Sequence, residues 1–301
     1  HVGERVLAPT WGGYKDMKEI PLSLSYLQEA KRAGMKITPL LHNDFDLQET
    51  KKLLHDSGAV QNLARQITAT ALVYDFDGWN LDFENMDEAD KFLYTKFIKT
   101  VSEKLHMHGK EISVDITVNS NSPNWSLCYD RKGMAAYVDY EVIMGYDQTP
   151  GGSRYSGSVS SYSWLKHHIA MLLKQVPNNK LVLGLPFYTR IWTGKEGQAA
   201  SSVLMMKQIK SLLGQNNIGL FWNPEDRQYV GIWEENGQTR KVWFEERRSL
   251  QEKVSLAHDY KLAGLAFWRY GFETEDIYDQ IEGAFLNKKD ESVRYKNRSE
   301  D

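Results

Sequence analysis

The chain has 301 residues, of which 41% are hydrophobic and 26% charged, and its formal net charge is −3. This length suits one large α/β barrel or two ordinary domains with a substantial core. The near-neutral charge offers no basic surface for nucleic acid, and no apolar run approaches the roughly 20 residues that span a bilayer.

The single cysteine, Cys128, excludes an internal disulfide framework and predicts a small buried side chain. Because the first residue is His1, we expect a processed form or a fragment of a longer protein.

Strand-like apolar segments alternate with amphipathic helical segments along most of the chain. This alternation predicts an α/β fold with a parallel sheet and crossover helices, and the length favours closure into a TIM-type (β/α)8 barrel. Seven strands are legible where such a barrel has eight, so we expect the remaining strand to be irregular or to precede His1. The candidates are residues 5–10, 36–41, 78–84, 112–118, 140–145, 181–187 and 264–268.

Among the helical segments, residues 87–106 have the clearest pattern. Apolar residues repeat there at the i, i+3, i+4 spacing of one buried face: Tyr94, Phe97, Ile98, Val101 and Leu105. Asp87 is a predicted N-cap, and Gly109 is a predicted stop signal. The other helical candidates are residues 24–33, 58–71, 163–175 and 249–260.

The alternation is interrupted between residues 189 and 246. This interval holds a predicted helix at 199–213 and then two aromatic-rich strands on either side of Asn236 and Gly237, a strong β-hairpin signal. The domain boundaries that follow are a catalytic barrel at 1–188 and 247–286, a small α+β insertion at 189–246, and a charged, disordered tail at 287–301.

The stretch YDFDGWNLDFEN, residues 74–85, concentrates acidic residues on a predicted strand. Residues two apart on a strand face the same way, so Asn80, Asp82 and Glu84 are expected to point toward the barrel axis. In barrels of this kind the C-terminal ends of the strands carry the chemistry, and Glu84 ends the predicted strand. Side chains two apart start from Cα atoms roughly 6.5–7 Å apart, so the two carboxyl groups can approach closely.

Two carboxyl groups in one poorly hydrated pocket cannot both ionise cheaply, so one pKa rises. Glu84 at the mouth is then the natural general acid, while Asp82 holds negative charge or a shared hydrogen bond. Such a close pair suits retaining glycoside cleavage better than inverting cleavage, which needs room for a water. The strand pattern alone leaves a merely polar barrel interior as the alternative.

Four segments in order resemble motifs of glycoside hydrolase family 18, the chitinase-like enzymes. Residues 77–84 resemble its DxxDxDxE signature on the fourth strand, and MGYD (144–147) resembles its Met-x-Tyr-Asp on the sixth. LGLPFYTR (183–190) and GLAFWR (264–269) resemble its seventh and eighth strands, and the resemblance makes residues 5–10 the second. DGWNLDFEN and VWFEE further resemble the bacterial branch of spore-cortex and cell-wall lytic N-acetylglucosaminidases.

The resemblance implies that Glu84 protonates the glycosidic oxygen and later activates water. Asp82 would orient and charge-stabilise the 2-acetamido group of the substrate, whose carbonyl oxygen attacks the anomeric carbon in place of a protein nucleophile. Tyr146 would donate a hydrogen bond to that oxygen, with Asp147 beside it. Trp268 would form the apolar floor under the bound sugar.

Asn80 departs from the family pattern, which has an aspartate there. An amide cannot share a proton with Asp82 as a second carboxyl might, so we expect Asn80 to donate a fixed hydrogen bond that keeps Asp82 more readily ionised. Asp77 has the opposite strand parity and is interpreted as a structural hydrogen-bond partner. The other candidates for substrate contact are Met144, Asn43, Asn119 and Arg190, and four tryptophans could line a sugar cleft or simply pack: Trp11, Trp125, Trp192 and Trp222.

These patterns predict a retaining, substrate-assisted glycosidase for β-1,4-linked N-acetylglucosamine polymers, with peptidoglycan favoured over chitin. We expect no metal, because the histidines are not accompanied by other residues at metal-ligand spacing, and we expect no organic cofactor. The expected partner is the polysaccharide alone, a monomer is favoured, and the expected location is extracellular, at the cell envelope or spore surface. The alternatives are a chitinase, an endoglycosidase releasing N-linked glycans, a non-catalytic chitinase-like lectin and a structural envelope protein. Retention of Glu84 disfavours the lectin, and the inward Asp82–Glu84 pair disfavours the structural protein.

Overall fold

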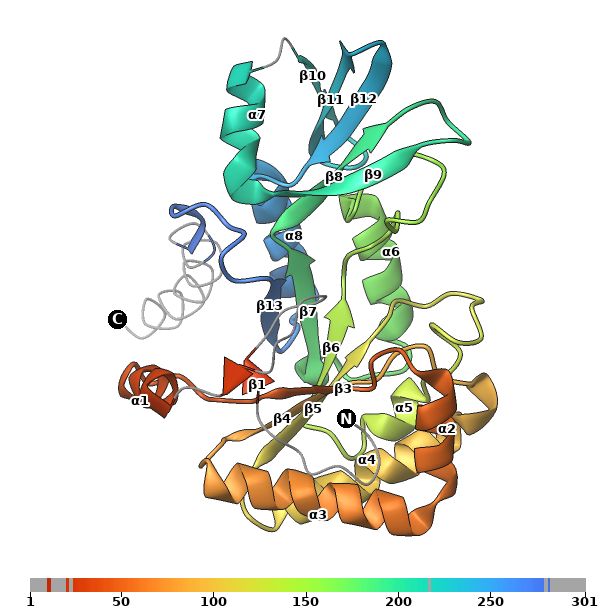
Figure 1. Ribbon diagram of the computed structural model, residues 1–301, viewed down its shortest axis with the longest axis vertical. Helices are drawn as coiled ribbons and strands as arrows, with labels where there is room; N and C mark the ends of the chain where they lie inside the picture. The colour runs from red at the N-terminus through yellow and green to blue at the C-terminus, as the bar shows by residue number, and fades with distance from the viewer. Residues whose placement is uncertain (1–9, 12–19, 22–23, 216–217, 279–280, 282–301) are drawn as a thin grey trace, which may run out of the picture. The chain divides into compact units, whose positions relative to one another are not determined.

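The computed structural model describes residues 10–11, 20–21, 24–215, 218–278 and 281 (Figure 1). The chain divides into two compact units, His1–Glu141 and Val142–Asp301, and the boundary falls inside strand β6 (Tyr140–Met144). Near its start, β1 (Thr10–Trp11) and β2 (Ile20–Pro21) form a short antiparallel pair. Among the described residues, no helix has the length and apolar character needed to cross a membrane.

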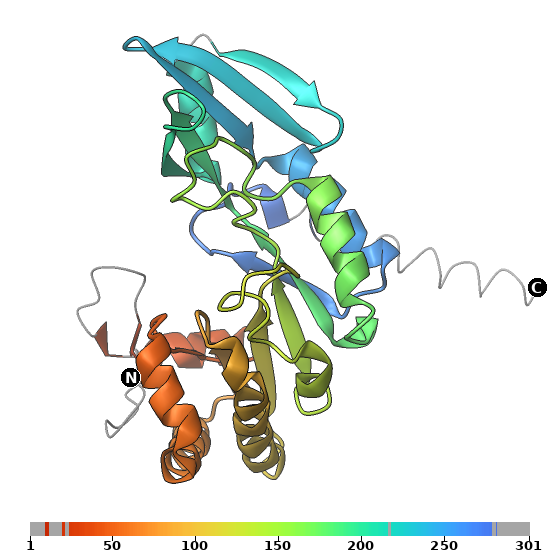
Figure 2. The same ribbon diagram turned by 90° about the vertical axis from the view of Figure 1, so that its right-hand side faces the viewer.

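The first unit contains a parallel sheet and the helices that pack against it. Its main elements are β3 (Leu40–His42), β4 (Gly78–Asp82), β5 (Glu111–Ile116), α1 (Leu24–Arg32), α2 (Leu47–His55), α3 (Ser57–Val73), η1 (Glu88–Asp90), α4 (Lys91–His106) and α5 (Arg131–Met134). Strand β4 lies between its two neighbours, with Leu81 paired to Leu41 on one side and to Val114 on the other. Figure 2 shows α3 and α4 side by side along the sheet.

Aspartate side chains cap the start of three helical segments of this unit. Asp46 precedes α2, Asp56 precedes α3 and Asp87 precedes η1, and each carboxylate accepts backbone N–H bonds of 2.8 to 3.1 Å from residues two or three further on. These bonds satisfy donors that the first helical turn leaves free. The predicted cap at Asp87 is therefore confirmed, although a short 3-10 turn separates it from α4, and Gly109 ends the segment with a φ of 66°.

The apolar side of β4 faces the helices. The fully buried ring of Phe83 lies 5.6 Å from the rings of Tyr94 and Phe97 on α4. The indole N–H of Trp79 donates a 3.0 Å hydrogen bond to the backbone oxygen of Ile67 on α3. Because alternate residues of a strand face opposite ways, the polar residues of β4 lie on the other side of the sheet.

The second unit combines parallel strands with an antiparallel sheet. Its elements are α6 (Tyr162–Leu172), η2 (Asn178–Lys180), β7 (Leu181–Pro186), β8 (Tyr188–Thr193), β9 (Ala200–Met205), η3 (Met206–Gln208), α7 (Ile209–Gln215), β10 (Gly219–Asn223), β11 (Gln228–Glu235), β12 (Gln238–Phe244), α8 (Arg247–Asp259) and β13 (Gly264–Trp268). Strands β7 and β13 are parallel, with Leu183 paired to Leu265. The antiparallel sheet has the order β10-β11-β12-β8-β9.

Two glycines allow β6 and β7 to approach each other. The N–H of Gly145, directly after β6, donates a 3.0 Å hydrogen bond to the backbone oxygen of Gly184 on β7. A Cβ on Gly145 would lie 2.4 Å from that oxygen, and a Cβ on Gly184 would lie 2.6 Å from the oxygen of Ile143. Only glycine at both positions therefore lets the two strands lie this close, directly before Tyr146.

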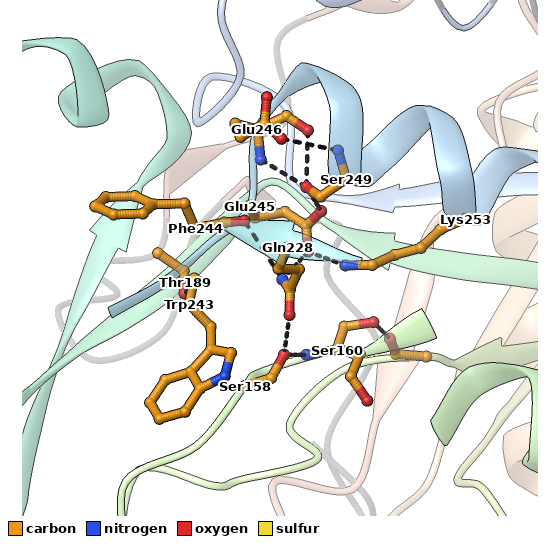
Figure 3. Close-up of polar contacts among 12 residues, drawn as sticks. Ser158, Ser160, Thr189, Gln228, Trp243, Phe244, Glu245, Glu246, Ser249 and Lys253 are labelled. Carbon is orange, nitrogen blue, oxygen red and sulfur yellow. Dashed lines mark hydrogen bonds and ion pairs between the residues drawn. The ribbon is translucent and has the colours of Figure 1, made fainter. Parts of the chain in front are cut away.

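A buried polar network joins the antiparallel sheet to α8 and to the segment after β6 (Figure 3). The ammonium of Lys253 is paired with Glu245, and both side chains are at most 1% exposed. Glu245 also accepts bonds from Ser249, at 2.8 Å, and from the amide of Gln228, at 3.3 Å. Gln228 in turn accepts a 2.5 Å bond from Ser158. The insertion is thereby tied to its own unit by hydrogen bonds as well as by apolar contacts.

Most predicted elements are confirmed. The hairpin turn is confirmed by the β11–β12 pair, with positive φ at both Asn236 and Gly237. The helix expected at 199–213 was wrong in its first half, because residues 200–205 form β9 and pair with β8. The expected strand 78–84 ends at Asp82, and α2 was not predicted. Residues 5–9 and the expected tail at 287–301 lie outside the described residues, and the domain boundaries stay a prediction.

Candidate active site

Asp82 is the last residue of β4 and is 9% exposed. Its Oδ1 atom has no hydrogen-bond partner within the described part of the chain. Burial raises the pKa of this carboxyl well above its ordinary value, because the charged form loses water. A buried carboxyl with a free oxygen is prepared to receive a donor from a bound molecule.

Asn80 binds the neighbouring strand rather than Asp82. Its Nδ2 atom donates to the hydroxyl of Ser113 and to the carboxyl of Asp115 on β5, both at 3.0 Å. Burial raises the pKa of Asp115, and the charge of Asp82 raises it further, whereas the bond from Asn80 lowers it. The fixed hydrogen bonds expected from Asn80 go to β5 and not to Asp82. The expectation that Asn80 keeps Asp82 more readily ionised than an aspartate would stays a prediction.

The backbone of Glu84 is held by the side chain of Asn43, which is 5% exposed. The Asn43 amide donates to the backbone oxygen of Glu84 at 2.7 Å and accepts from its N–H at 3.0 Å. The second amide hydrogen goes to Thr50, at 2.8 Å. The hydroxyl of Tyr129 donates to the preceding carbonyl, that of Phe83, at 2.8 Å. The half-buried side chain of Glu84 therefore starts from a fixed backbone.

In the second unit, Tyr146 and Asp147 directly follow β6 and Gly145. The Tyr146 ring lies 6.3 Å from the ring of Tyr188, edge to face. Asp147, with a positive φ of 54°, accepts bonds from the Tyr188 hydroxyl at 2.9 Å and from Arg190 at 3.2 Å. Burial, together with the adjacent carboxylate, raises the pKa of Tyr188, so this hydroxyl keeps the proton that it donates.

The remaining predicted residues have separate positions. Met144 ends β6 and Trp268 ends β13, and both are half-buried. The carboxyl of Asp77 accepts a 2.7 Å bond from the N–H of Ile37 and so joins β4 to the segment before β3. Asn119 follows β5 and is half-buried.

The tryptophans differ in exposure. Trp192 is 1% exposed, and its indole donates to the Gly157 oxygen at 2.8 Å, so it packs rather than lines a cleft. Trp125 is 42% exposed and lies 5.8 Å from the ring of Phe45. Trp222 is covered by the guanidinium of Arg248, 3.6 Å from its ring centre. Nothing is described for the side chain of Trp11.

Asp115 and Tyr188, which contact the candidate site residues Asn80 and Asp147, were not among the candidates from the sequence. The signal for Asp115 was present in the strand EISVDI, where Ser113 and Asp115 alternate with apolar residues as Asn80 and Asp82 do on β4. No comparable pattern marks Tyr188, whose role depends on contact with Asp147. Across the described residues, no group of three or more His, Cys, Asp or Glu side chains could hold a metal ion.

Parallel strands with crossover helices, and acidic residues at and just after the end of β4, are features found in barrel glycosidases. The model of Glycosyl hydrolases family 18 matches residues 24–273, and the chain therefore belongs to this family. The fold is accordingly that of a TIM-type barrel.

Similar proteins include bacterial glycosylases. "Uncharacterized glycosylase YvbX" of Bacillus subtilis is 26% identical over 265 residues, which cover 85% of this chain and 76% of that protein. The "Cortical fragment-lytic enzyme" of Bacillus subtilis is 26% identical over 243 residues, 79% of this chain but only 56% of the enzyme. The chain thus spans little more than half the length of that relative.

Solved structures share the fold at low identity. The chitinase from Chromobacterium violaceum superposes with a TM-score of 0.82 at 20% identity, covering 89% of this chain and 85% of that one. The spore cortex-lytic enzyme SleL of Bacillus megaterium gives a TM-score of 0.81 at 22% identity, covering 89% and 63%.

Proposed function

We propose that this domain is a retaining glycosidase that cleaves β-1,4-linked N-acetylglucosamine polymers, with peptidoglycan of the cell wall or spore cortex as its substrate. The observation that carries the proposal is the buried Asp82 with its free oxygen, two residues before a Glu84 whose backbone is fixed by Asn43. The relative named for cortical fragments favours peptidoglycan over chitin. The polymer lies outside the cytoplasm, and so would the enzyme.

In the proposed reaction Glu84, as a carboxylic acid, gives its proton to the glycosidic oxygen while the bond to the leaving sugar breaks. The carbonyl oxygen of the 2-acetamido group forms the new bond to the anomeric carbon from the opposite face. The Glu84 carboxylate then takes a proton from water, and the water oxygen displaces the acetamido oxygen. Two inversions give net retention, with the substrate in the place of a protein nucleophile.

The other residues act on the acetamido group. Asp82, when ionised, accepts its N–H through the free oxygen and opposes the positive charge that develops on it. Tyr146 donates to the acetamido oxygen, and the ring of Trp268 lies under the apolar face of the sugar. Within the second unit, Tyr188 and Arg190 hold Asp147, which directly follows Tyr146 in the chain. Asn43 positions Glu84.

The test is digestion of purified peptidoglycan and of chito-oligosaccharides, with products identified by mass spectrometry. The wild type is expected to release products with reducing-end N-acetylglucosamine, and Glu84→Gln to lose roughly 10²- to 10⁴-fold in rate, since the general acid is removed. Glu103→Gln, on the exposed face of α4, is the matched control and should keep the wild-type rate.

A wild-type rate in Glu84→Gln would contradict the assignment of the acid. Binding of either polymer by wild type and variant, without cleavage by wild type, would favour the lectin alternative. Cleavage of the chito-oligosaccharides alone would replace peptidoglycan by chitin as the substrate.

A further inference from the structure

We propose that Asp115 on β5 is the carboxyl partner of Asp82, in place of the aspartate that the family signature has at position 80. In this role Asp115 positions Asp82 and sets its protonation during catalysis. This inference rests on the proposed function of Asp82. Asp115 is a positioning residue, because it acts on the substrate only through Asp82.

Strand register brings the two carboxyl groups to one place. On the parallel strands β4 and β5, Asn80 pairs with Ser113 and Leu81 with Val114, so the next step along both strands reaches Asp82 and Asp115. Neighbouring strands are about 4.8 Å apart, and residues at equivalent steps face the same side. The hydrogen bonds from Asn80 to Ser113 and Asp115 show that these side chains share the polar face of β4.

Asn80 fixes one side of this arrangement. A side-chain amide nitrogen has two hydrogens, and in Asn80 one goes to Ser113 and the other to Asp115. The carboxyl of Asp115 is thereby anchored through one oxygen, while the charge of Asp82 acts on it from the adjacent strand. An aspartate at position 80, as the family signature has, would put a third carboxyl into this place.

The electrostatics support a single proton held between the pair. Burial raises the pKa of both carboxyl groups, and the charge of Asp82 raises that of Asp115 further, so ionisation of one carboxyl opposes ionisation of the other. In the described part of the chain, the titratable groups beside the pair include His42 of β3, which is paired with Asp82, and the buried Tyr94 and Tyr129. Glu84, Cys128 and Glu141 act electrostatically on one or both of these tyrosines. Burial lowers the pKa of His42 and raises the pKa of Tyr94. Both shifts favour the neutral forms of these side chains.

The test is an exchange of the two side chains. Asn80→Asp alone creates three neighbouring carboxyl groups, so the pKa of Asp82 should rise, the acidic limb of the kcat profile should move to higher pH, and kcat at neutral pH should fall about tenfold or more. The double variant Asn80→Asp/Asp115→Asn restores one partner from the other strand and should recover kcat to within about threefold of wild type. KM should change little in either. Asn62→Asp, exposed on α3, controls for the added charge.

A merely structural Asp115 predicts a different outcome: the double variant would then be as slow as Asn80→Asp or slower, and this result would overturn the inference. A second readout needs no activity. Carbon-13 carboxyl NMR, with Asp82→Asn for assignment, should show Asp82 titrating in two steps in wild type and in one step in Asp115→Asn. Identical titration curves of Asp82 in wild type and in Asp115→Asn would also overturn the inference. A wild type that titrates as expected but cleaves neither polymer would sink the proposed function and not the pairing.

Discussion

At the scale of single residues, Asn43 shows how a side chain outside the reaction can control it. Its amide makes three hydrogen bonds, two to the backbone of Glu84 and one to Thr50, in a place where water cannot replace them. A buried donor or acceptor left without a partner costs about 1–3 kcal/mol. Glu84 is therefore positioned by a neighbouring strand end rather than by β4 alone.

Asn43→Ala should lower the free energy of unfolding by about 1–3 kcal/mol, since the N–H and C=O of Glu84 lose their partner. It should also lower kcat on the order of tenfold or more, because the acid is no longer held in line with the bond to be cleaved. Urea denaturation and steady-state kinetics measure the two effects.

Thr50→Val is the control for Asn43, since it removes the hydrogen bond between Asn43 and Thr50 and leaves both bonds to Glu84. It should lose stability and keep kcat. If folded Asn43→Ala turned over at the wild-type rate, Asn43 would have no part in positioning the acid.

At the scale of elements, the Glu245–Lys253 pair links β12 to α8, and Gln228 carries the network on to Ser158 (Figure 3). Burial raises the pKa of Glu245 and lowers that of Lys253, and the charge of each opposes the shift of the other. The segment that contains Ser158 also reaches β6, since Ser160 donates a 2.6 Å bond to the Gly145 oxygen. The antiparallel sheet thus supports the strand end from which Tyr146 extends.

Lys253→Met should lower the free energy of unfolding by about 3–5 kcal/mol, because Glu245 is left as an uncompensated buried charge. Adding Glu245→Gln removes that charge. The amide oxygen can still accept from Gln228 and the amide nitrogen can donate to the Ser249 hydroxyl, so the double variant should recover at least half of the loss. Denaturant titrations of both variants measure this. Equal instability of the single and double variants would mean that lost packing, not the stranded charge, accounts for the effect.

At the scale of the whole molecule, alternation of strands and helices predicted the order of elements because each buried face leaves a periodic trace in the sequence. The same reasoning missed β9, whose strand state depends on pairing with β8, a contact that no local pattern records. It proposed Asp82 and Glu84 as site residues from one predicted strand, which in the structure ends at Asp82. Asp115 was missed because the pattern of β5 was not compared with that of β4. The partners of Asn80 were not found, because strand register decides which groups the amide can reach.

The central claim is that Glu84 and Asp82 carry out substrate-assisted hydrolysis with retention. The most direct test is proton NMR of the first products formed by wild type from a chito-oligosaccharide or a purified peptidoglycan fragment, recorded before mutarotation. The account predicts that the newly formed reducing end appears as the β-anomer and only later equilibrates. Initial formation of the α-anomer would mean direct attack by water on the sugar, and it would contradict the account.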